Sequence, residues 1–133
     1  VVAGGGQVAV AQPEFAPDGR ALAYIADVTG WNQLYCYDLT TGESLSAWTD
    51  DVEHSWYSEP WFAAADNPQS EDHGYVIAFQ FNAATRRETL DIFDARDLNR
   101  GPRAQVALPR HIPTGFHGCW IDAPRIAGWN ARA

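Results

Sequence analysis

The amino-acid sequence contains no lysine: all nine of its basic residues are arginines, and they stand against 17 acidic residues. The formal net charge is therefore −8. Acidic residues separate the arginines that lie between Arg86 and Arg110, which predicts a mixed, solvated surface there. Nucleic acids and anionic membranes both require clustered cationic side chains. The charge balance thus excludes nucleic acid as a partner and disfavours an anionic membrane surface.

Cysteines and long apolar runs are also scarce. Cys36 and Cys119 are the only cysteines and lie far apart, so they form no disulfide framework and are expected to pack as small buried hydrophobes. The apolar runs are far too short to cross a bilayer, so we predict no transmembrane segment. The start of the chain lacks the charged and apolar regions of a secretory signal, and the expected compartment is the cytoplasm.

Helix signals are nearly absent, and short runs rich in β-branched and aromatic residues alternate with turn residues. Asp18-Gly19 marks a hairpin turn, because both residues tolerate positive φ, and Thr29-Gly30 and Thr41-Gly42 mark further turns. The expected strands are residues 8–15, 21–27, 33–39, 44–48, 57–63, 75–81, 89–94 and 104–108, with a last short strand near 116–121. Four antiparallel strands per ~40 to 50 residues are typical of a propeller blade. We therefore predict an all-β chain of antiparallel β-propeller-type blades, about two four-stranded sheets, forming an incomplete propeller.

The first half carries a blade-like motif. Its residues are Gln12–Arg20 (QPEFAPDGR), Ala23–Asp27 (AYIAD) and Leu34–Leu39 (LYCYDL), with a turn at Thr41–Glu43. The pattern resembles a WD40-like blade of TolB-type proteins, and most closely the propeller of prolyl-oligopeptidase-family peptidases. Peptidase chemistry of that family needs a Gly-x-Ser-x-Gly elbow. The sequence has none, so the resemblance implies the blade and not the activity.

The second half carries a different, ordered series of motifs. They are Tyr57–Phe62 (YSEPWF), Ser70–Val76 (SEDHGYV), Leu90–Ala95 (LDIFDA), Gly101-Pro102 with Ala104–Pro109, and Pro113–Gly118 (PTGFHG). In order and spacing they resemble the C-terminal end of carotenoid cleavage oxygenases, a family that includes stilbene-cleaving enzymes. The resemblance implies a propeller with an axial iron(II) held by histidines from several blades. It also implies oxidative cleavage, with dioxygen, of a carbon–carbon double bond in an apolar polyene or stilbene substrate.

The same resemblance assigns roles to two residues. His117 matches the last of the iron-ligating histidines, and Glu59 matches a glutamate that accepts a hydrogen bond from a ligand imidazole. A neutral imidazole suits iron(II), and the carboxylate fixes the tautomer of the ring. His54, His73 and His111 match no ligand position. The chain thus offers one metal-ligating histidine, no catalytic residue of its own, and an Fe(II) cofactor that we expect the isolated chain not to retain.

Two acidic clusters near histidines favour solvated turns over metal sites, because neighbouring residues on a strand point to opposite faces. They comprise Asp50, Asp51, Glu53 and His54, and Glu71, Asp72 and His73.

We therefore predict two parts: residues 1–55, a WD40-like blade, and residues 56–133, a carotenoid-oxygenase-like C-terminal blade with a frayed C-terminus. The leading interpretation is a fragment of a non-haem iron dioxygenase that is inactive as a lone chain. The alternative is a non-catalytic β-propeller binding or structural module. Because two blades cannot close a ring, open edges and uncovered faces predict self-association.

Overall fold

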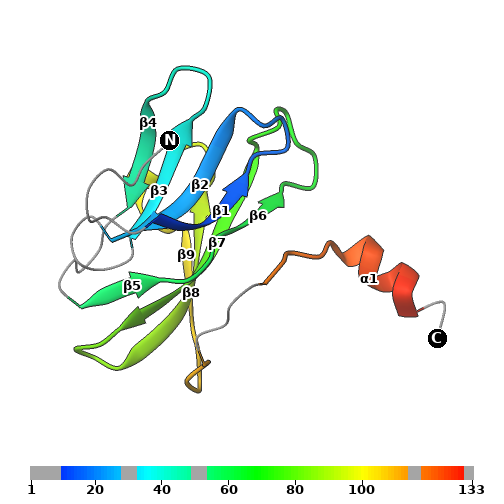
Figure 1. Ribbon diagram of the computed structural model, residues 1–133. Helices are drawn as coiled ribbons and strands as arrows, with labels where there is room; N and C mark the ends of the chain where they lie inside the picture. Colours follow the sequence, from blue (N-terminus) through cyan, green and yellow to red (C-terminus); the bar gives the residue numbers. More distant parts are fainter. Residues whose placement is uncertain (1–9, 28–32, 49–53, 114–117, 131–133) are drawn as a thin grey trace.

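The structure, a computed structural model, describes residues 10–27, 33–48, 54–113 and 118–130. These residues form two antiparallel sheets (Figure 1). The first sheet has the order β1-β2-β3-β4, and its strands are β1 (Val10–Phe15), β2 (Ala21–Ala26), β3 (Gln33–Asp38) and β4 (Ser44–Trp48). All four strands agree with the predicted ones to within one or two residues at each end. The predicted turn at Thr29-Gly30 lies outside the described residues.

The other two predicted turns shape this sheet. Gly19 adopts a φ of +70° between β1 and β2, and its N–H donates to the Ala16 carbonyl at 2.8 Å. Glycine adopts such a φ without steric cost. After β3, the Asp38 carboxylate accepts hydrogen bonds from the N–H groups of Thr40 and Thr41 at 2.6 and 2.9 Å. These bonds, the one from Thr41 foremost, lower the pKa of Asp38.

The second sheet contains five strands in the order β5-β7-β8-β9, with β6 paired to β7. They are β5 (Ser55–Tyr57), β6 (Trp61–Ala64), β7 (Gly74–Asn82), β8 (Arg87–Asp94) and β9 (Ala104–Ala107). The single strand predicted over residues 57–63 is wrong, because the chain breaks at residues 58–60. Pro60 has no N–H to give to a ladder, and the Ser58 hydroxyl accepts the Phe79 N–H at 3.1 Å. β5 and β6 therefore pair with separate stretches of β7.

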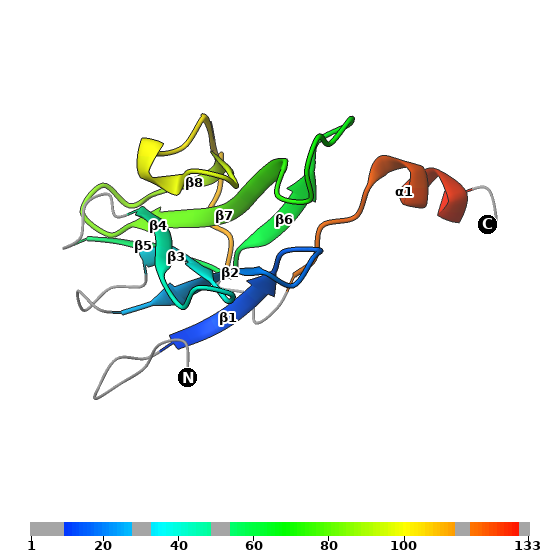
Figure 2. The ribbon, with the colours of Figure 1, turned by 90° about the horizontal axis from the view of Figure 1, so that it is seen from above.

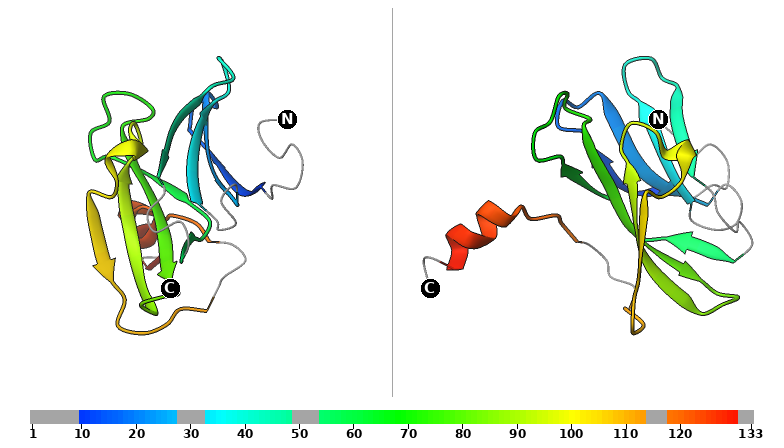
Figure 3. Two further views of the ribbon diagram at one scale, coloured as in Figure 1. Left: turned by 90° about the vertical axis from the view of Figure 1, so that its left-hand side faces the viewer. Right: turned by 180° about the vertical axis from the view of Figure 1, so that it is seen from behind.

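The two sheets face each other (Figures 2 and 3), and buried apolar side chains from both fill the space between them. These are Ala23, Ile25, Leu34 and Cys36 of the first sheet, Tyr57, Val76, Ala78 and Phe93 of the second, and Leu98 of the short 3-10 helix η1 (Leu98–Arg100). Full burial of one large apolar side chain contributes ~1.5–3 kcal/mol. This shared core joins the two sheets.

A buried chain of hydrogen bonds crosses the same interface. The Trp48 indole N–H donates to the Tyr57 hydroxyl at 3.1 Å, and this hydroxyl donates to the Asp91 carboxylate at 3.0 Å. Asp91 is 0% exposed and also accepts bonds from Thr89 at 2.6 Å and Gln105 at 3.2 Å. A buried carboxylate is tolerated where donors surround it. The chain of bonds therefore ties β4 of the first sheet to β5 and β8 of the second.

The C-terminal segment differs from the prediction. Residues 118–122 form no strand, although the sequence predicts one near 116–121. The chain predicted to fray at this end instead forms helix α1 (Ala123–Asn130). This helix stands away from the sheets (Figures 1 and 3). Asp122 is a favourable residue before a helix, and Pro124 lies in the first turn, where a missing N–H costs nothing. No helix in the described part of the chain is long and apolar enough to span a membrane.

Candidate functional site

The link between β5 and β6 fixes the backbone around Glu59. The Ser58 N–H donates to the Phe79 carbonyl at 2.9 Å, and the Ser58 hydroxyl accepts from the Phe79 N–H at 3.1 Å. On the other side, Pro60 is fully buried. Glu59, itself half-buried, is therefore anchored by both of its neighbours.

The Glu59 carboxylate reaches a segment 59 residues further along the chain, where its Oε2 accepts a hydrogen bond from the Gly118 N–H at 2.7 Å. Gly118 closes the Gly-Phe-His-Gly motif and directly follows His117 in the sequence. The structure thus brings Glu59 to the motif that carries the predicted metal ligand. His117 itself lies outside the described residues, so its role as a ligand and its pairing with Glu59 stay predictions.

Trp61, the first residue of β6, packs against the backbone of Gly118. A Cβ atom built on Gly118 would lie 2.4 Å from the Trp61 ring, so this approach requires glycine. The indole also meets the Phe79 ring edge-on, with centroids 5.5 Å apart. Its Nε1 is buried and has no hydrogen-bond partner among the described residues. Gly118 is therefore held by a carboxylate and by an aromatic ring.

A second carboxylate, that of Glu14 on β1, lies close enough to Glu59 for the two charges to interact. Burial raises the pKa of Glu14, the charge of Glu59 raises it further, and a hydrogen bond from the backbone of Phe62 lowers it. Because Phe62 belongs to β6, Glu14 also links the two sheets. The sequence motif that contains Glu14 gives it no role in a site. Its only signal is a charged residue within a strand, which cannot reveal a partner on another sheet.

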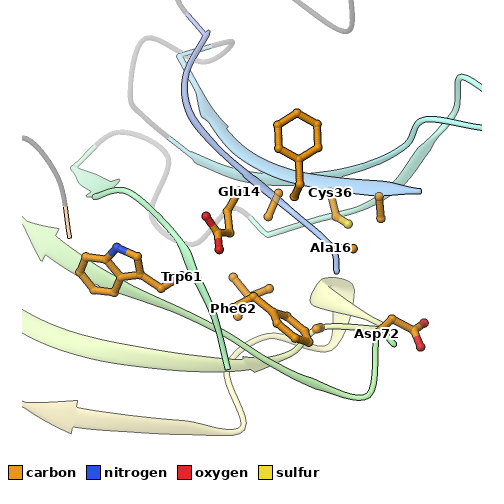
Figure 4. A pocket seen from close by; sticks show the side chains of 11 residues that line it. Glu14, Ala16, Cys36, Trp61, Phe62 and Asp72 are labelled. Atoms are coloured by element: carbon orange, nitrogen blue, oxygen red, sulfur yellow. The ribbon is translucent and has the colours of Figure 1, made fainter. Parts of the chain in front are cut away.

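A small pocket, with a volume of about 30 Å³, opens between the sheets beside Glu14 (Figure 4). Its walls are mainly small or aromatic: Phe15, Ala16, Ala21, Ala23, Cys36, Trp61, Phe62, Val76 and Ala95, with Glu14 and Asp72 as acidic members. Burial raises the pKa of the Cys36 thiol, which makes it a poor nucleophile. Cys36 is buried as predicted, whereas Cys119 is exposed, because residues 118–122 belong to neither sheet.

The three histidines that match no ligand position make other contacts. Nδ1 of His73 accepts a hydrogen bond from the Gln69 N–H at 3.1 Å, in the turn before β7. The His111 ring pairs with the Glu88 carboxylate at the start of β8. The backbone carbonyl of His54 accepts a bond from the turn after β7.

The two acidic clusters give no metal site within the described residues. Most of the first cluster lies outside them, namely Asp50, Asp51 and Glu53. In the second, Glu71 and Asp72 are exposed, and Asp72 accepts a bond from the Ser70 hydroxyl at 2.5 Å. No group of three or more histidine, cysteine or acidic side chains in the described part of the chain could hold a metal ion. Glu14 and Glu59 therefore form no complete metal site with the other described residues.

Comparison with curated proteins finds relatives named for cleavage of stilbenes and carotenoids. The chain is 33% identical over 95 residues to lignostilbene-alpha,beta-dioxygenase isozyme III of Sphingomonas paucimobilis, covering 71% of this chain and 19% of that protein. It is 36% identical over 76 residues to resveratrol cleavage oxygenase 1 of Chaetomium globosum (57% and 13%). It is 35% identical over 71 residues to the zeaxanthin 7,8(7',8')-cleavage dioxygenase of Crocus sativus (51% and 19%). The chain thus spans 19% or less of the length of these relatives.

Solved structures share the fold. A mutant of Synechocystis apocarotenoid oxygenase superposes with a TM-score of 0.75 at 24% identity, covering 86% of this chain and 26% of that one. The lignostilbene dioxygenase of Pseudomonas brassicacearum superposes with a TM-score of 0.68 at 26% identity, covering 77% and 24%. The predicted fold, all-β with antiparallel propeller-type blades in an incomplete propeller, is confirmed.

The profile of one protein family spans both sheets. It is described as retinal pigment epithelial membrane protein (RPE65), and it matches residues 9–122. The match includes the first sheet. The sequence pattern of that sheet resembles a blade of prolyl-oligopeptidase-family peptidases, but no comparison shows this resemblance. Because one profile covers β1 with Glu14, the β5–β6 link with Glu59, and Gly118, this chain belongs to the RPE65 family, which includes the carotenoid cleavage oxygenases.

Proposed function

We propose that this chain is the C-terminal part of an oxygenase that cleaves a carbon–carbon double bond in an apolar alkene, a stilbene or a carotenoid, with iron(II) and dioxygen. The names of the relatives support this reaction class. The hydrogen bond of 2.7 Å between the Gly118 N–H and Glu59 carries the proposal. It attaches a carboxylate to the residue that follows His117.

In this function His117 would hold the iron, and Glu59 and Glu14 would support it. Iron(II), when bound, supplies the activation of dioxygen. Glu59 positions the backbone of the metal motif through its hydrogen bond to Gly118. The Trp61 ring packs against the same glycine and keeps water from the side that it covers. Two neighbouring carboxylates favour positive charge nearby, which a metal ion and the N–H groups of its imidazole ligands provide.

The chain alone does not complete such a site. It offers a single matching histidine, and it spans 19% or less of the length of its relatives. The remaining ligands of a whole oxygenase would lie in blades beyond this chain. We therefore expect the isolated chain to bind iron(II) weakly, to lose it on purification, and to be inactive.

Metal analysis tests this expectation directly. Iron(II) is added anaerobically to the 133-residue chain and to His117→Ala, and both are desalted before the bound iron is measured. We expect far less than one iron per chain in both proteins. One iron per chain that is lost in His117→Ala, together with oxygen uptake and cleavage of a stilbene, would contradict the incomplete site.

A chimera tests the proposed chemistry. Residues 9–122 replace the matching segment of the Sphingomonas paucimobilis lignostilbene dioxygenase. We expect a chimera that retains iron and cleaves lignostilbene. Replacing His117 with alanine removes the iron, and Glu59→Gln lowers iron affinity or activity by about 10- to 100-fold. Glu43→Gln, in the exposed turn before β4, is the control. A folded chimera without iron would refute the proposal and favour a non-catalytic binding module.

Self-association forms part of the proposal for the isolated chain. All four residues of β9 are exposed, so the second sheet ends in an open edge. Phe15 on β1, an edge strand of the first sheet, is 56% exposed. Open strand edges and exposed apolar side chains favour pairing with another copy.

A further inference from the structure

A hollow at one end of the second sheet brings three arginines together. It is lined by the β7–β8 turn, the start of β8 and the segment that follows β9, and its volume is about 320 Å³. The cationic side chains are Arg86, Arg87 and Arg110, with His111 beside them. The two segments, far apart in sequence, both lie at the lower end of the second sheet in Figure 1.

The turn between β7 and β8 holds Arg86 in an unfavourable backbone conformation. Arg86 has a φ of 54°, the only positive φ of a non-glycine residue in the described part of the chain. The Asn82 side chain fixes this turn by accepting bonds from the Thr85 N–H and hydroxyl at 2.9 and 3.0 Å. Glycine would adopt this φ with less strain. The conformation of the turn therefore does not explain why an arginine stands there.

Glu88 is the only acidic residue of the lining, and its side chain is already engaged. Oε2 accepts a hydrogen bond from the Ile112 N–H at 2.7 Å, and Oε1 pairs with the His111 ring. The Glu88 carbonyl also accepts a bond from the Leu108 N–H at 3.0 Å. These contacts hold the segment that contains Arg110 against the start of β8.

The three arginines differ from the others in the described structure. Four others each pair with an aspartate: Arg20, Arg96, Arg100 and Arg103. Within the described residues, Arg86, Arg87 and Arg110 have no carboxylate partner. The one carboxylate of the lining, Glu88, is engaged by His111 and the Ile112 N–H, so a bound anion would lower the repulsion among these like charges.

We propose that this hollow binds a phosphate dianion, either free or as a phosphate monoester. A guanidinium group is a planar fork of donors that matches phosphate oxygens in pairs. Phosphate has enough oxygens and charge to engage several forks, whereas a carboxylate has two oxygens and one charge. The hollow has the size of a small-molecule site. This site is independent of the oxygenase function proposed above.

Titration calorimetry of the 133-residue chain with sodium phosphate, at ionic strength held constant with sodium chloride, tests the site. We expect saturable binding that Arg110→Gln weakens by about tenfold, the loss of one charge-assisted contact. Arg86→Gly also weakens binding, while its thermal unfolding midpoint does not fall because the strained φ is relieved. Arg20→Gln, in the turn between β1 and β2, leaves binding unchanged. Absence of saturable binding, or equal affinities of Arg110→Gln and Arg20→Gln, would overturn the proposal.

Vesicles identify the source of the phosphate. The chain is sedimented with phosphatidylcholine vesicles that contain phosphatidic acid and with vesicles of phosphatidylcholine alone. Binding to the first kind only, lost in Arg110→Gln and competed by inorganic phosphate, assigns the site to a lipid headgroup. Phosphate binding without vesicle binding assigns it to a soluble phosphate. Failure of both phosphate and vesicles to bind refutes the site.

Discussion

Asp94 shows at the scale of a residue how two arginines hold a carboxylate in its charged form. Arg96 lies 3.0 Å and Arg103 lies 3.3 Å from the Asp94 carboxylate oxygens. Hydrogen bonds from the Arg96 side chain are the main cause that lowers the pKa of Asp94 from 3.8 to about 2. A lowered folded-state pKa stabilises the fold above pH 3.8, and this contribution is lost as the pH falls toward 2.

Replacing Asp94 with asparagine should therefore destabilise the chain in a pH-dependent manner. We expect a loss of about 1 kcal/mol at pH 7, because the Arg96 and Arg103 side chains are 46% and 63% exposed and water screens both pairs. The loss should shrink below pH 3.8 as the wild-type carboxylate becomes protonated. Urea unfolding of both proteins from pH 7 downward measures it. Asp66→Asn, in the exposed turn after β6, is the control, and a loss at Asp94 that stays constant with pH would contradict the prediction.

Gly118→Ala tests the contact between Trp61 and the backbone of the metal motif. The new Cβ would lie 2.4 Å from the indole, so the ring or the backbone must move. We expect a loss of about 1–3 kcal/mol in the free energy of unfolding. The same substitution should cost less in a Trp61→Ala background, since the obstacle is gone. Equal losses in both backgrounds, by urea unfolding, would show that the contact is not formed.

At the scale of the elements, most strands follow from local pattern because apolar runs and turn residues are local signals. The strand break at Ser58–Pro60 was missed, since YSEPWF has strand-forming aromatic residues at both ends and reads as one strand unless Pro60 is taken to stop the ladder. Helix α1 was missed although Asp122 and Pro124 form a helix-start pattern, because the segment is short and lies beyond the last blade motif. The proline that ends the strand and the helix-start residues Asp122 and Pro124 were both present in the sequence.

The candidate sites depend on contacts between elements, which the sequence does not display. Glu59 could be predicted because its motif resembles a known family, but Glu14 comes from the other sheet and carries no motif of its own. The sequence predicts a mixed surface for the arginines, but it does not display that the fold brings Arg86, in the β7–β8 turn, and Arg110, in the segment after β9, to one hollow. His117 lies outside the described residues, and its role stays a prediction.

The buried chain of hydrogen bonds between Trp48, Tyr57 and Asp91 predicts a large effect for a small change. Tyr57→Phe removes one hydroxyl, which leaves the Trp48 indole N–H without its partner and takes one of two donors from Asp91 Oδ2, to which Gln105 still donates. We expect a loss of about 1–3 kcal/mol in the free energy of unfolding. Tyr75→Phe, at a tyrosine that is 40% exposed, should change it little. Chemical denaturation of both variants decides the matter, and equal effects would contradict a structural role for the chain of bonds.

At the scale of the whole molecule, the open edge of β9 predicts concentration-dependent self-association. Val106 on this strand is 49% exposed, and a charged side chain there should oppose edge pairing. We expect Val106→Lys to shift the mass measured by light scattering toward the monomer. Gln69→Lys, in the exposed turn before β7, controls for the added charge. A wild-type chain that is monomeric at all concentrations would exclude association through this edge.

The proximity of the Glu14 and Glu59 carboxylates limits how genes for such proteins can recombine. Glu14 lies on the first sheet and Glu59 in the β5–β6 link of the second, and Trp48 and Tyr57 are likewise divided between the two sheets. A protein whose gene recombined in the link between β4 and β5 would inherit one member of each pair from one parent and the other member from the second parent. Both pairs would then have to fit by chance. The smallest unit that relatives can exchange without loss is therefore the pair of sheets together, and not a single blade.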